Sequence, residues 1–355
     1  MKVGILTQHF HKNYGGILQN WALQQVLIRM GHEPLTFEHD TCYSRTRWLL
    51  RTIKHIIQKR SFASLPAYPY RGRVGHKPFI DFIINSIHSV PVHDFTPDTE
   101  RRYECDAFIV GSDQVWRPAF NLGRLYNMFL DFASDRIRKI AYAASFGVTV
   151  WEYTAEEAQR CRELAKRFDA ISVREDTAVE LCCKYLGVEA KWVLDPTLLI
   201  EKEDYMSLCK DVVSCNHFVF VYALHLNNSI VSFANELATG KHLDVKVMMA
   251  GEALHPDDNI QQWLAMYRDA DYIVTDSFHG MAFSIIFNKP FYVFKNDSGG
   301  VARYYSLLNL LELGDRIVDD RVKPSTNNIE WKIVNNKLEE MKQKSLHFLL
   351  DSLSK

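Results

Sequence analysis

The chain has 355 residues with 42 Lys or Arg and 43 Asp or Glu, a formal net charge of −1, so we expect no nucleic-acid partner that depends on overall positive potential. Hydrophobic residues make up 47% and charged residues 24%, which is typical of a globular protein, and the length predicts two domains. The seven cysteines lack the paired spacing of zinc or redox sites, so we expect neither a metal nor a cofactor.

The first predicted elements are a strand and a helix joined by a loop with two glycines. Residues 2–7 form an apolar run that is too short for a signal peptide, and no window approaches a membrane span, which predicts a cytoplasmic protein. A helix follows at 17–30. Just before it, Gly15 and Gly16 allow a close backbone approach to a ligand, or they form only a tight turn.

Residues 41–80 form a basic segment with nine Lys or Arg and no Asp or Glu. Apolar residues recur there at helical spacing, from Trp48 to Ile57, which predicts a basic amphipathic helix within a helical excursion over 41–100. Its apolar side either packs on its own domain or lets residues 45–60 contact an anionic membrane from the cytoplasmic face.

Polar turns follow a series of short apolar runs from residue 105 onward. Strands are predicted at 107–110, 139–144 and 170–173, as in a parallel sheet, and Thr177 with Glu180 predicts a capping box for the next helix. The turns hold Asp113, Gln114, Trp116 and Arg174, and Trp116 is either a stacking surface for a sugar or ordinary core.

A second set of strands begins after Asp195-Pro196. Strands at 217–224, 245–250, 272–274 and 290–294 alternate with helices, and the last helix carries its apolar residues on one side. We therefore predict an α/β chain of two facing, doubly wound Rossmann-like domains, 1–195 and 196–325, with a C-terminal helix at 326–355 that crosses back to the first domain.

The turn at 275–280 combines anion binding with proton transfer. Ser277 or Asp276 is placed to cap the following helix, whose free N–H groups favour an anion. His279 adds an imidazole that exchanges a proton near neutral pH. The other interpretation is that His279 is a buried structural histidine at a helix start.

Five motifs occur in a fixed order along the chain: 13–24 (NYGGILQNWALQ), 110–116 (VGSDQVW), 171–175 (ISVRE), 194–197 (LDPT) and 275–280 (TDSFHG). With them the chain resembles the polysaccharide pyruvyltransferase family. The resemblance implies a fold like that of GT-B glycosyltransferases. It also implies that the enolpyruvyl group of phosphoenolpyruvate is transferred to two hydroxyls of a sugar or lipid-linked oligosaccharide, which forms a pyruvate ketal in a surface or exopolysaccharide precursor and releases phosphate.

The resemblance also implies roles for individual residues. His279 would be the general acid/base, and Arg174 would bind the donor anion unless it only forms an ion pair with Glu175 or Asp195. The helix starts at Gly15, Gly16 and Ser277 would add N–H groups for the donor. Some members carry an arginine at the position of Ser277, and Arg303 and Lys295 are the candidates to replace it here. The acceptor-binding residues would be Asp113, Gln114, Trp116 and Asn13, and the alternative for Asn13 is that it only shapes its turn.

Two other functions fit the same pattern. One is a glycosyltransferase of the GT-B type that uses a nucleotide sugar, which predicts stabilisation by a nucleoside diphosphate. The other is a non-catalytic glycan-binding homologue, an alternative favoured by the serine at position 277.

Overall fold

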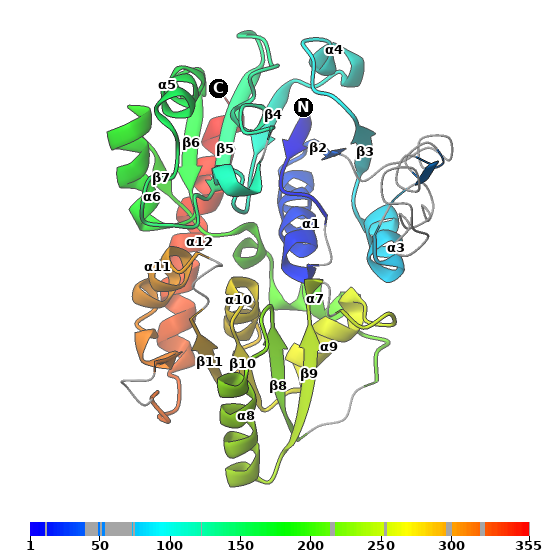
Figure 1. Cartoon of the computed structure of the whole chain (residues 1–355), viewed down its shortest axis with the longest axis vertical. Coiled ribbons are helices and arrows are strands. Elements are labelled where there is room, and N and C mark those ends of the chain that lie inside the picture. The colour runs from blue at the N-terminus through cyan, green and yellow to red at the C-terminus, as the bar shows by residue number, and fades with distance from the viewer. Residues whose placement is uncertain are drawn as a thin grey trace.

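The computed structural model describes residues 1–10, 13–39, 49, 52, 53, 73, 75–121, 123–213, 217–251, 254–295, 300–319 and 324–354. Within them the chain forms two sheets in which every strand pairing is parallel (Figure 1). The first has the order β3-β2-β1-β4-β5-β6-β7, with strands β1 (Lys2–Leu6), β2 (Glu33–His39), β3 (Ser89–Val92), β4 (Ala107–Val110), β5 (Arg138–Ala144), β6 (Ala170–Val173) and β7 (Lys191–Trp192). The second has the order β12-β11-β10-β8-β9, with β8 (Phe218–Ala223), β9 (Asp244–Met249), β10 (Tyr272–Thr275), β11 (Phe291–Phe294) and β12 (Ile317–Val318).

Helices cover these sheets and connect their strands. They are α1 (Tyr14–Arg29), α3 (Lys77–Ser86), α4 (Thr99–Tyr103), α5 (Ala155–Ala165), α6 (Asp176–Leu181), α7 (Lys202–Leu208), α8 (Asn228–Lys241), α9 (Ile260–Asp269), α10 (Phe278–Ile286), α11 (Ala302–Leu310) and α12 (Trp331–Ser354). Short turns of helix are η1 (Pro118–Phe120), η2 (Asn127–Phe129), η3 (Cys182–Leu186), η4 (Pro196–Leu199) and η6 (Gly314–Arg316). The α/β fold class with two Rossmann-like, doubly wound halves is confirmed.

The two sheets face each other with their carboxyl ends. In Figure 1, α1 lies above and α10 below the middle of the molecule, and η4 lies between them. Because α1 follows β1 and α10 follows β10, both helices begin where the carboxyl ends of the strands meet. In open α/β sheets this is the edge at which ligands bind.

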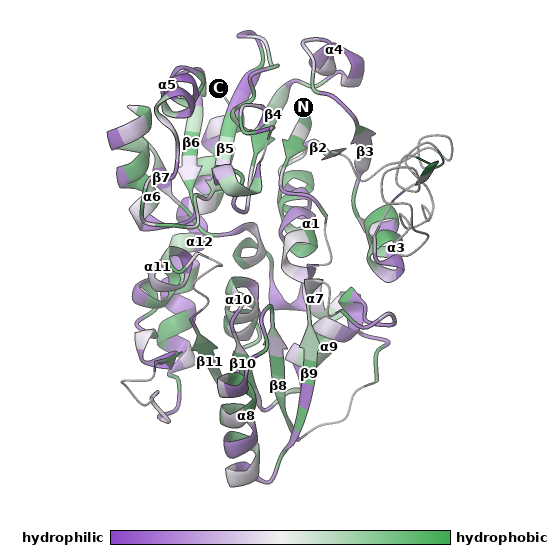
Figure 2. Ribbon diagram, in the orientation of Figure 1, coloured by the Kyte–Doolittle hydropathy of each residue, from purple (hydrophilic) through white to green (hydrophobic). Residues whose placement is uncertain are grey.

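The hydrophobic core crosses from one half to the other. Tyr14 of α1 stacks on Trp263 of α9, with ring centroids 5.2 Å apart and an interplanar angle of 11°. Both residues belong to one cluster of buried side chains that includes residues of both sheets. Figure 2 shows β8, β10 and β11 in the green of hydrophobic residues. Apolar burial therefore holds the two halves together.

The C-terminal helix α12 crosses back to the first half, as predicted. Its Ser345 hydroxyl accepts a hydrogen bond from the backbone N–H of Leu194 at 3.0 Å. Its Phe348 ring packs at 6.2 Å from the ring of Tyr142 on β5. The helix thus bridges the end of the first sheet and the second half, which it follows in sequence (Figure 1).

Two backbone segments approach closely between the halves at a pair of glycines. Gly147 follows β5, and Gly300 precedes α11 with a φ of +87°. A Cβ on Gly300 would lie 2.2 Å from the carbonyl oxygen of Gly147. Only glycine fits at this approach.

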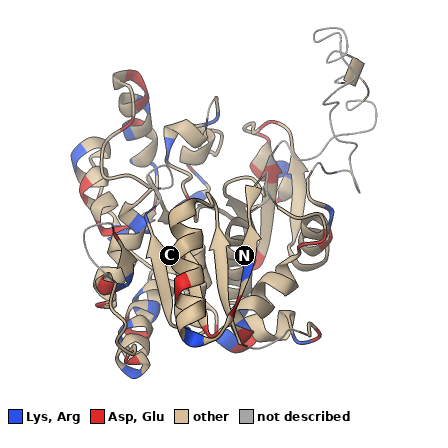
Figure 3. Cartoon of the chain, turned by 60° about the horizontal axis from the view of Figure 1, so that its bottom comes forward, with Lys and Arg blue, Asp and Glu red and all other residues tan. Residues whose placement is uncertain are grey.

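Charged side chains lie mainly on helices and loops around the sheets, with both signs interspersed (Figure 3). Among the described residues, none of the helices combines the length and the apolar character that a membrane crossing requires. The expected cytoplasmic location stays a prediction, as do the domain boundaries at 195 and 325.

The local pattern failed at the start of α6 and at β2 and β3, and a third prediction is not tested. The capping box at Thr177 and Glu180 is wrong, because α6 begins at Asp176, its N-cap is Glu175, and the Ser306 hydroxyl of α11 donates to Asp176 at 2.6 Å. The strands β2 and β3 were not expected, and β3 lies inside the predicted helical excursion. Most of the basic helix around Trp48–Ile57, with Arg45, Arg47, Arg51 and Lys54, lies outside the described residues.

Two adjacent leucines of α12 test its contribution to the fold. Leu349 is 0% exposed and Leu350 is 48% exposed. We expect Leu349→Ala to lower the free energy of unfolding by about 2–5 kcal/mol, because it leaves a cavity in the shared core. Leu350→Ala should have little effect. Urea unfolding followed by tryptophan fluorescence measures both, and equal effects would contradict the packing.

Candidate active site

Five ionisable side chains meet where the carboxyl ends of the two sheets face each other. The first half contributes Asp113 after β4, Arg174 directly after β6 and Asp195 after β7. The second half contributes His279 in the first turn of α10 and Arg303 in the first turn of α11. Asp113 is the most exposed of these side chains, at 16%. The structure therefore brings together an imidazole and two guanidiniums from opposite halves.

Arg174 forms ion pairs with two carboxylates. Its Nη1 lies 2.6 Å from Asp195 Oδ2, and its Nη2 lies 3.0 Å from Asp113 Oδ1. Burial acts to lower the pKa of Arg174, but the two carboxylates outweigh it and the pKa is raised. Arg174 Nε has no hydrogen-bond partner among the described residues. The pair with Asp195, one of the two structural pairings considered from sequence, is present.

Asp195 is the carboxylate that joins most parts of the site. Its Oδ2 also accepts from the Ser112 hydroxyl at 3.0 Å, and its Oδ1 accepts from the backbone N–H and the hydroxyl of Thr197 at 3.0 and 2.8 Å. Burial alone would raise the pKa of Asp195, but contacts with His279 and Arg174 hold it well below its usual value. Asp195 is therefore a fixed negative charge.

His279 lies between the first turns of α1 and α10. Its Nε2 is 3.7 Å from Asp195 Oδ2 and has no hydrogen-bond partner among the residues described. A Cβ on Gly15 would lie 2.1 Å from His279 Cγ, so the ring packs directly on the α1 backbone. Ser277, as predicted, caps α10 by accepting from the N–H of Gly280 at 3.3 Å. The imidazole is thus held in place with Nε2 facing the acidic group.

Both guanidiniums lie over the ring of Phe278. The Cζ atoms of Arg174 and Arg303 lie 4.7 and 5.3 Å from the centre of its ring. Arg303 Nη1 is also 3.6 Å from Asp113 Oδ1, which both arginines share. Burial, and then the charge of Arg174, lower the pKa of Arg303. Sequence reasoning missed Phe278, although its place beside His279 in the motif was a signal.

Arg303 and Lys295, the two candidates for the cation absent at Ser277, have different surroundings. Arg303 is in the cluster. Lys295, at the end of β11, forms an ion pair with Asp319, and its side chain is 35% exposed. No contact joins Lys295 to Arg174 or His279 among the described residues, so the expectation that it reaches the site is not met.

Glu175, the neighbour of Arg174, organises the loop after β5. Its Oε1 accepts from the Ser145 hydroxyl and from the N–H groups of Phe146 and Gly147, at 3.0, 2.9 and 3.0 Å. Burial raises its pKa. Sequence reasoning weighed it only as a partner for Arg174, and the Ser145-Phe-Gly147 turn was the signal for this other role.

Several predicted ligand contacts are replaced by contacts within the chain. Trp116 is fully buried, stacks on Phe129 at 4.9 Å and donates to the carbonyl of Met128, so it is core and cannot stack on a sugar. The Asn13 side chain accepts from the N–H groups of Gly15 and Gly16, so these donors cap α1, which begins at Tyr14 instead of residue 17.

Gln114 also contacts its own surroundings. Its Oε1 accepts from Arg117 at 3.2 Å, and its carbonyl accepts from Gln8 at 2.8 Å. It is 6% exposed. Asp113, in contrast, is both part of the charged cluster and its most exposed member, so of these two predicted acceptor residues only Asp113 faces the candidate site.

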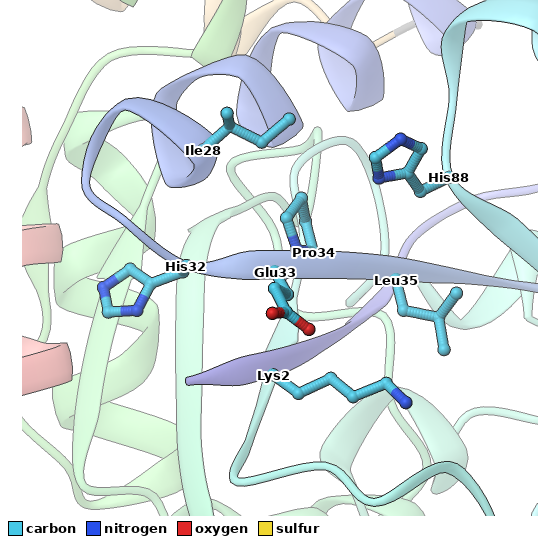
Figure 4. Close-up of a pocket in the computed structure, with 7 residues that line it drawn as sticks. All are labelled: Lys2, Ile28, His32, Glu33, Pro34, Leu35 and His88. Atoms are coloured by element: carbon cyan, nitrogen blue, oxygen red, sulfur yellow. The ribbon is translucent and has the colours of Figure 1, made fainter.

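A hollow of about 450 Å³ lies elsewhere, beside the end of α1 (Figure 4). Lys2 and Glu33, at the starts of β1 and β2, line it together with Ile28, His32, Pro34, Leu35 and His88. It is therefore at the amino ends of the strands, opposite the charged cluster. We do not assign the active site there, because ligands of such sheets bind at the carboxyl ends.

The fold and the cluster define an α/β protein of two Rossmann-like halves, with its candidate site between facing sheets. A family model described as polysaccharide pyruvyl transferase matches residues 13–298, which include four of the five side chains of the cluster. The chain belongs to the polysaccharide pyruvyltransferase family, and it is an enzyme of that family.

Solved structures similar to this chain include enzymes that act on or bind nucleotide sugars. A UDP-GlcNAc 2-epimerase from Neisseria meningitidis is 10% identical with a TM-score of 0.49, and the match covers 99% of each chain. A UDP-GlcNAc 2-epimerase from Methanocaldococcus jannaschii is 12% identical with a TM-score of 0.48, over 96% of this chain and 93% of that one. A glycosyltransferase from Rickettsia africae is 9% identical with a TM-score of 0.43, over 99% and 94%. No curated protein sequence matches.

The two glycines at the start of α1 test how His279 is held. Gly15→Ala places a methyl group against the imidazole, and such overpacking should lower the free energy of unfolding by about 1–3 kcal/mol. Gly16→Ala meets no atom within 4 Å and should be neutral or stabilising through helix propensity. Urea unfolding and the imidazole NMR signals of His279 report both effects. If only Gly16→Ala lowered the free energy of unfolding or shifted the His279 signals, the packing of Gly15 on the imidazole would be contradicted.

The pH dependence of stability in the variant Arg174→Met tests whether Asp113 and Asp195 are charged in the folded protein. The pKa values of Asp113 and Asp195 are lowered in the folded chain, so their stabilisation is present above pH ~4 and lost as the pH falls below it. Arg174→Met removes one group that lowers both pKa values, while burial still opposes both charged carboxylates, so both pKa values should rise and the variant should be penalised most at higher pH, where the carboxylates are charged. We expect a deficit in the free energy of unfolding of about 3–5 kcal/mol at pH 7 that narrows toward pH 4.5.

The matched control is Arg101→Met, which breaks an exposed ion pair with Asp98. It should leave stability nearly unchanged at both pH values, because exposed pairs contribute little. Urea unfolding at pH 4.5 and pH 7 measures all three proteins. An Arg174→Met deficit of the same size at both pH values would contradict the charge assignment.

Proposed function

We propose that the enzyme transfers the enolpyruvyl group of phosphoenolpyruvate onto two hydroxyls of a sugar, forming a pyruvate ketal and releasing phosphate. One observation carries the proposal: His279, Arg174 and Arg303 converge around Phe278 at the facing ends of the two sheets. The donor has a carboxylate and a phosphate, and guanidiniums bind such groups through paired, charge-assisted hydrogen bonds.

The donor would displace Asp113 from the two arginines. Asp113 Oδ1 contacts both guanidiniums, and its side chain is 16% exposed while that of Asp195 is fully buried. An anionic ligand that enters from this side would meet Asp113 first. Asp195 would stay in place and keep Arg174 oriented, and Asp113, once released, would be available to accept a hydrogen bond from a sugar hydroxyl.

His279 is the group proposed to move protons. In the first step the methylene carbon of phosphoenolpyruvate takes a proton, and C2 becomes cationic. A sugar hydroxyl attacks C2 and loses its proton, the C2–O bond to phosphate then breaks, and a second hydroxyl closes the ketal. One of the two hydroxyl protons returns to the base, and the other ends on the released phosphate. His279 Nε2, close to Asp195 and without a hydrogen-bond partner among the described residues, would give the first proton and take one back.

Phosphate release from phosphoenolpyruvate in the presence of a panel of glycosides tests the proposal. We expect His279→Ala to lower kcat by about 10²–10⁴-fold, the usual contribution of general acid/base catalysis. In D2O, the ketal methyl group should gain one deuterium per turnover, seen by mass spectrometry. Thermal stabilisation by UDP but not by phosphoenolpyruvate would instead favour a nucleotide-sugar glycosyltransferase.

Arg303 and Lys295 provide a matched pair of variants for the donor site. Arg303→Met removes a guanidinium of the cluster and should lower kcat/KM for phosphoenolpyruvate by about 30-fold or more, since loss of a buried charged contact costs about 2–5 kcal/mol. Lys295→Met breaks the ion pair with Asp319, away from the charged cluster, and should leave that value unchanged. If Lys295→Met instead lowered kcat/KM for phosphoenolpyruvate and Arg303→Met did not, Lys295 would be the residue that replaces the arginine absent at position 277.

A further inference from the structure

A second hollow, of about 250 Å³, lies beside the carboxyl end of β1. Among its lining residues are Thr7, Gln8, His9, Phe120, Asn121 and Arg124. Thr7 and the charged cluster both contact Ser112: the Thr7 hydroxyl donates to the Ser112 carbonyl at 2.9 Å, and the Ser112 hydroxyl donates to Asp195 at 3.0 Å. One residue therefore separates this hollow from the group that anchors the candidate active site.

An exposed aromatic ring forms part of the wall. Phe120, the last residue of η1, is 48% exposed. The Arg117 guanidinium lies 4.9 Å from the centre of this ring. Arg117 itself is held by Glu152 at 3.1 Å and by Gln114 at 3.2 Å. The ring is thus fixed on one side by a cation and offers apolar surface on which the C–H face of a sugar ring can pack.

Polar groups around the ring are held in place by one another. Arg124 Nη1 lies 3.0 Å from His9 Nε2, and because a guanidinium can only donate, the imidazole nitrogen accepts. The Gln8 side-chain amide donates to the Gln114 carbonyl and to Asn121 Oδ1, at 2.8 and 3.1 Å. None of the described lining residues is acidic. Such an arrangement suits hydroxyl groups and ring oxygens, which need donors at fixed positions.

The size of the hollow limits what it can hold. Pockets for drug-sized ligands are usually about 300–1,000 Å³, so this one is too small for a nucleotide sugar and suits a single pyranose ring. The aromatic surface expected at Trp116 is buried in the core, and Phe120 is the aromatic residue that remains exposed beside the same turn.

We propose that this hollow binds one sugar ring of the acceptor, with Phe120 as the packing surface and Arg124 as a hydrogen-bond donor. The proposal rests on the proposed function, because it places the acceptor beside the donor that Arg174 and Arg303 would bind. It moves sugar recognition from Trp116 and Asn13 to Phe120 and Arg124.

Saturation-transfer NMR with the methyl glycosides of galactose, glucose, mannose and N-acetylglucosamine tests the site without catalysis. The wild-type chain should bind at least one of them, and Phe120→Ala should raise its Kd roughly 3- to 10-fold, the range expected for loss of one aromatic contact. Ala119→Trp, which puts a large ring on another residue that lines the hollow, should weaken binding as well. Ile333→Ala removes an exposed side chain on α12, outside the hollow, and should change nothing. Absence of binding to the wild type, or unchanged binding by Phe120→Ala, would overturn the proposal.

Kinetics separate this proposal from the proposed function. With phosphoenolpyruvate and the glycoside that binds, Phe120→Ala should raise the acceptor KM and leave the phosphoenolpyruvate KM unchanged. A raised phosphoenolpyruvate KM would overturn the acceptor site, because the hollow would then belong to the donor. If Phe120-dependent binding occurs but wild type releases no phosphate, the sugar site stands and the pyruvyl transfer falls. If wild type releases phosphate and Phe120→Ala binds and turns over the glycoside as wild type does, the pyruvyl transfer stands and the sugar site falls.

Discussion

The buried carboxylate of Asp195 is the interaction on which the candidate site depends. It contacts Arg174 from the end of β6, Ser112 from the turn after β4 and Thr197 at the start of η4, and it lies 3.7 Å from His279 of the other half. A buried charge is tolerated only when it is paired and hydrogen-bonded, so these partners are fixed together. One acidic side chain thus sets the position of groups from four separate segments.

Apolar packing keeps this polar centre rigid. Tyr14 and Trp263 stack across the interface, and α12 adds Leu349 and Phe348 to the same core from the far end of the chain. Arg174 and Arg303, which repel each other, stay close because both lie over the ring of Phe278 and Asp113 contacts both. The site therefore combines a strong local field with little freedom to rearrange, which is the condition for electrostatic catalysis.

Local chemistry was readable from the sequence, as was the return of the C-terminal helix, but individual side-chain contacts between the halves were not. The strands at 107–110 and 170–173 have the predicted bounds, and Ser277 caps its helix, because a strand run or a cap depends on neighbours in the chain. The packing of Gly15 on His279 joins opposite halves and left no local trace. Thr177 had the right pattern for a cap, but the contact between Ser306 and Asp176 moved the helix start. Trp116 was ambiguous because the same turn composition fits a buried or an exposed ring.

The close approach of Gly147 and Gly300 has a consequence for which sequence changes the boundary between the halves tolerates. At this approach main chain meets main chain, because a Cβ on Gly300 would lie 2.2 Å from the carbonyl oxygen of Gly147. The N–H of the same Gly147 donates to Glu175, the neighbour of Arg174. A side chain added at position 300 would therefore push on the turn that Glu175 organises, so a residue outside the charged cluster constrains the loop beside it.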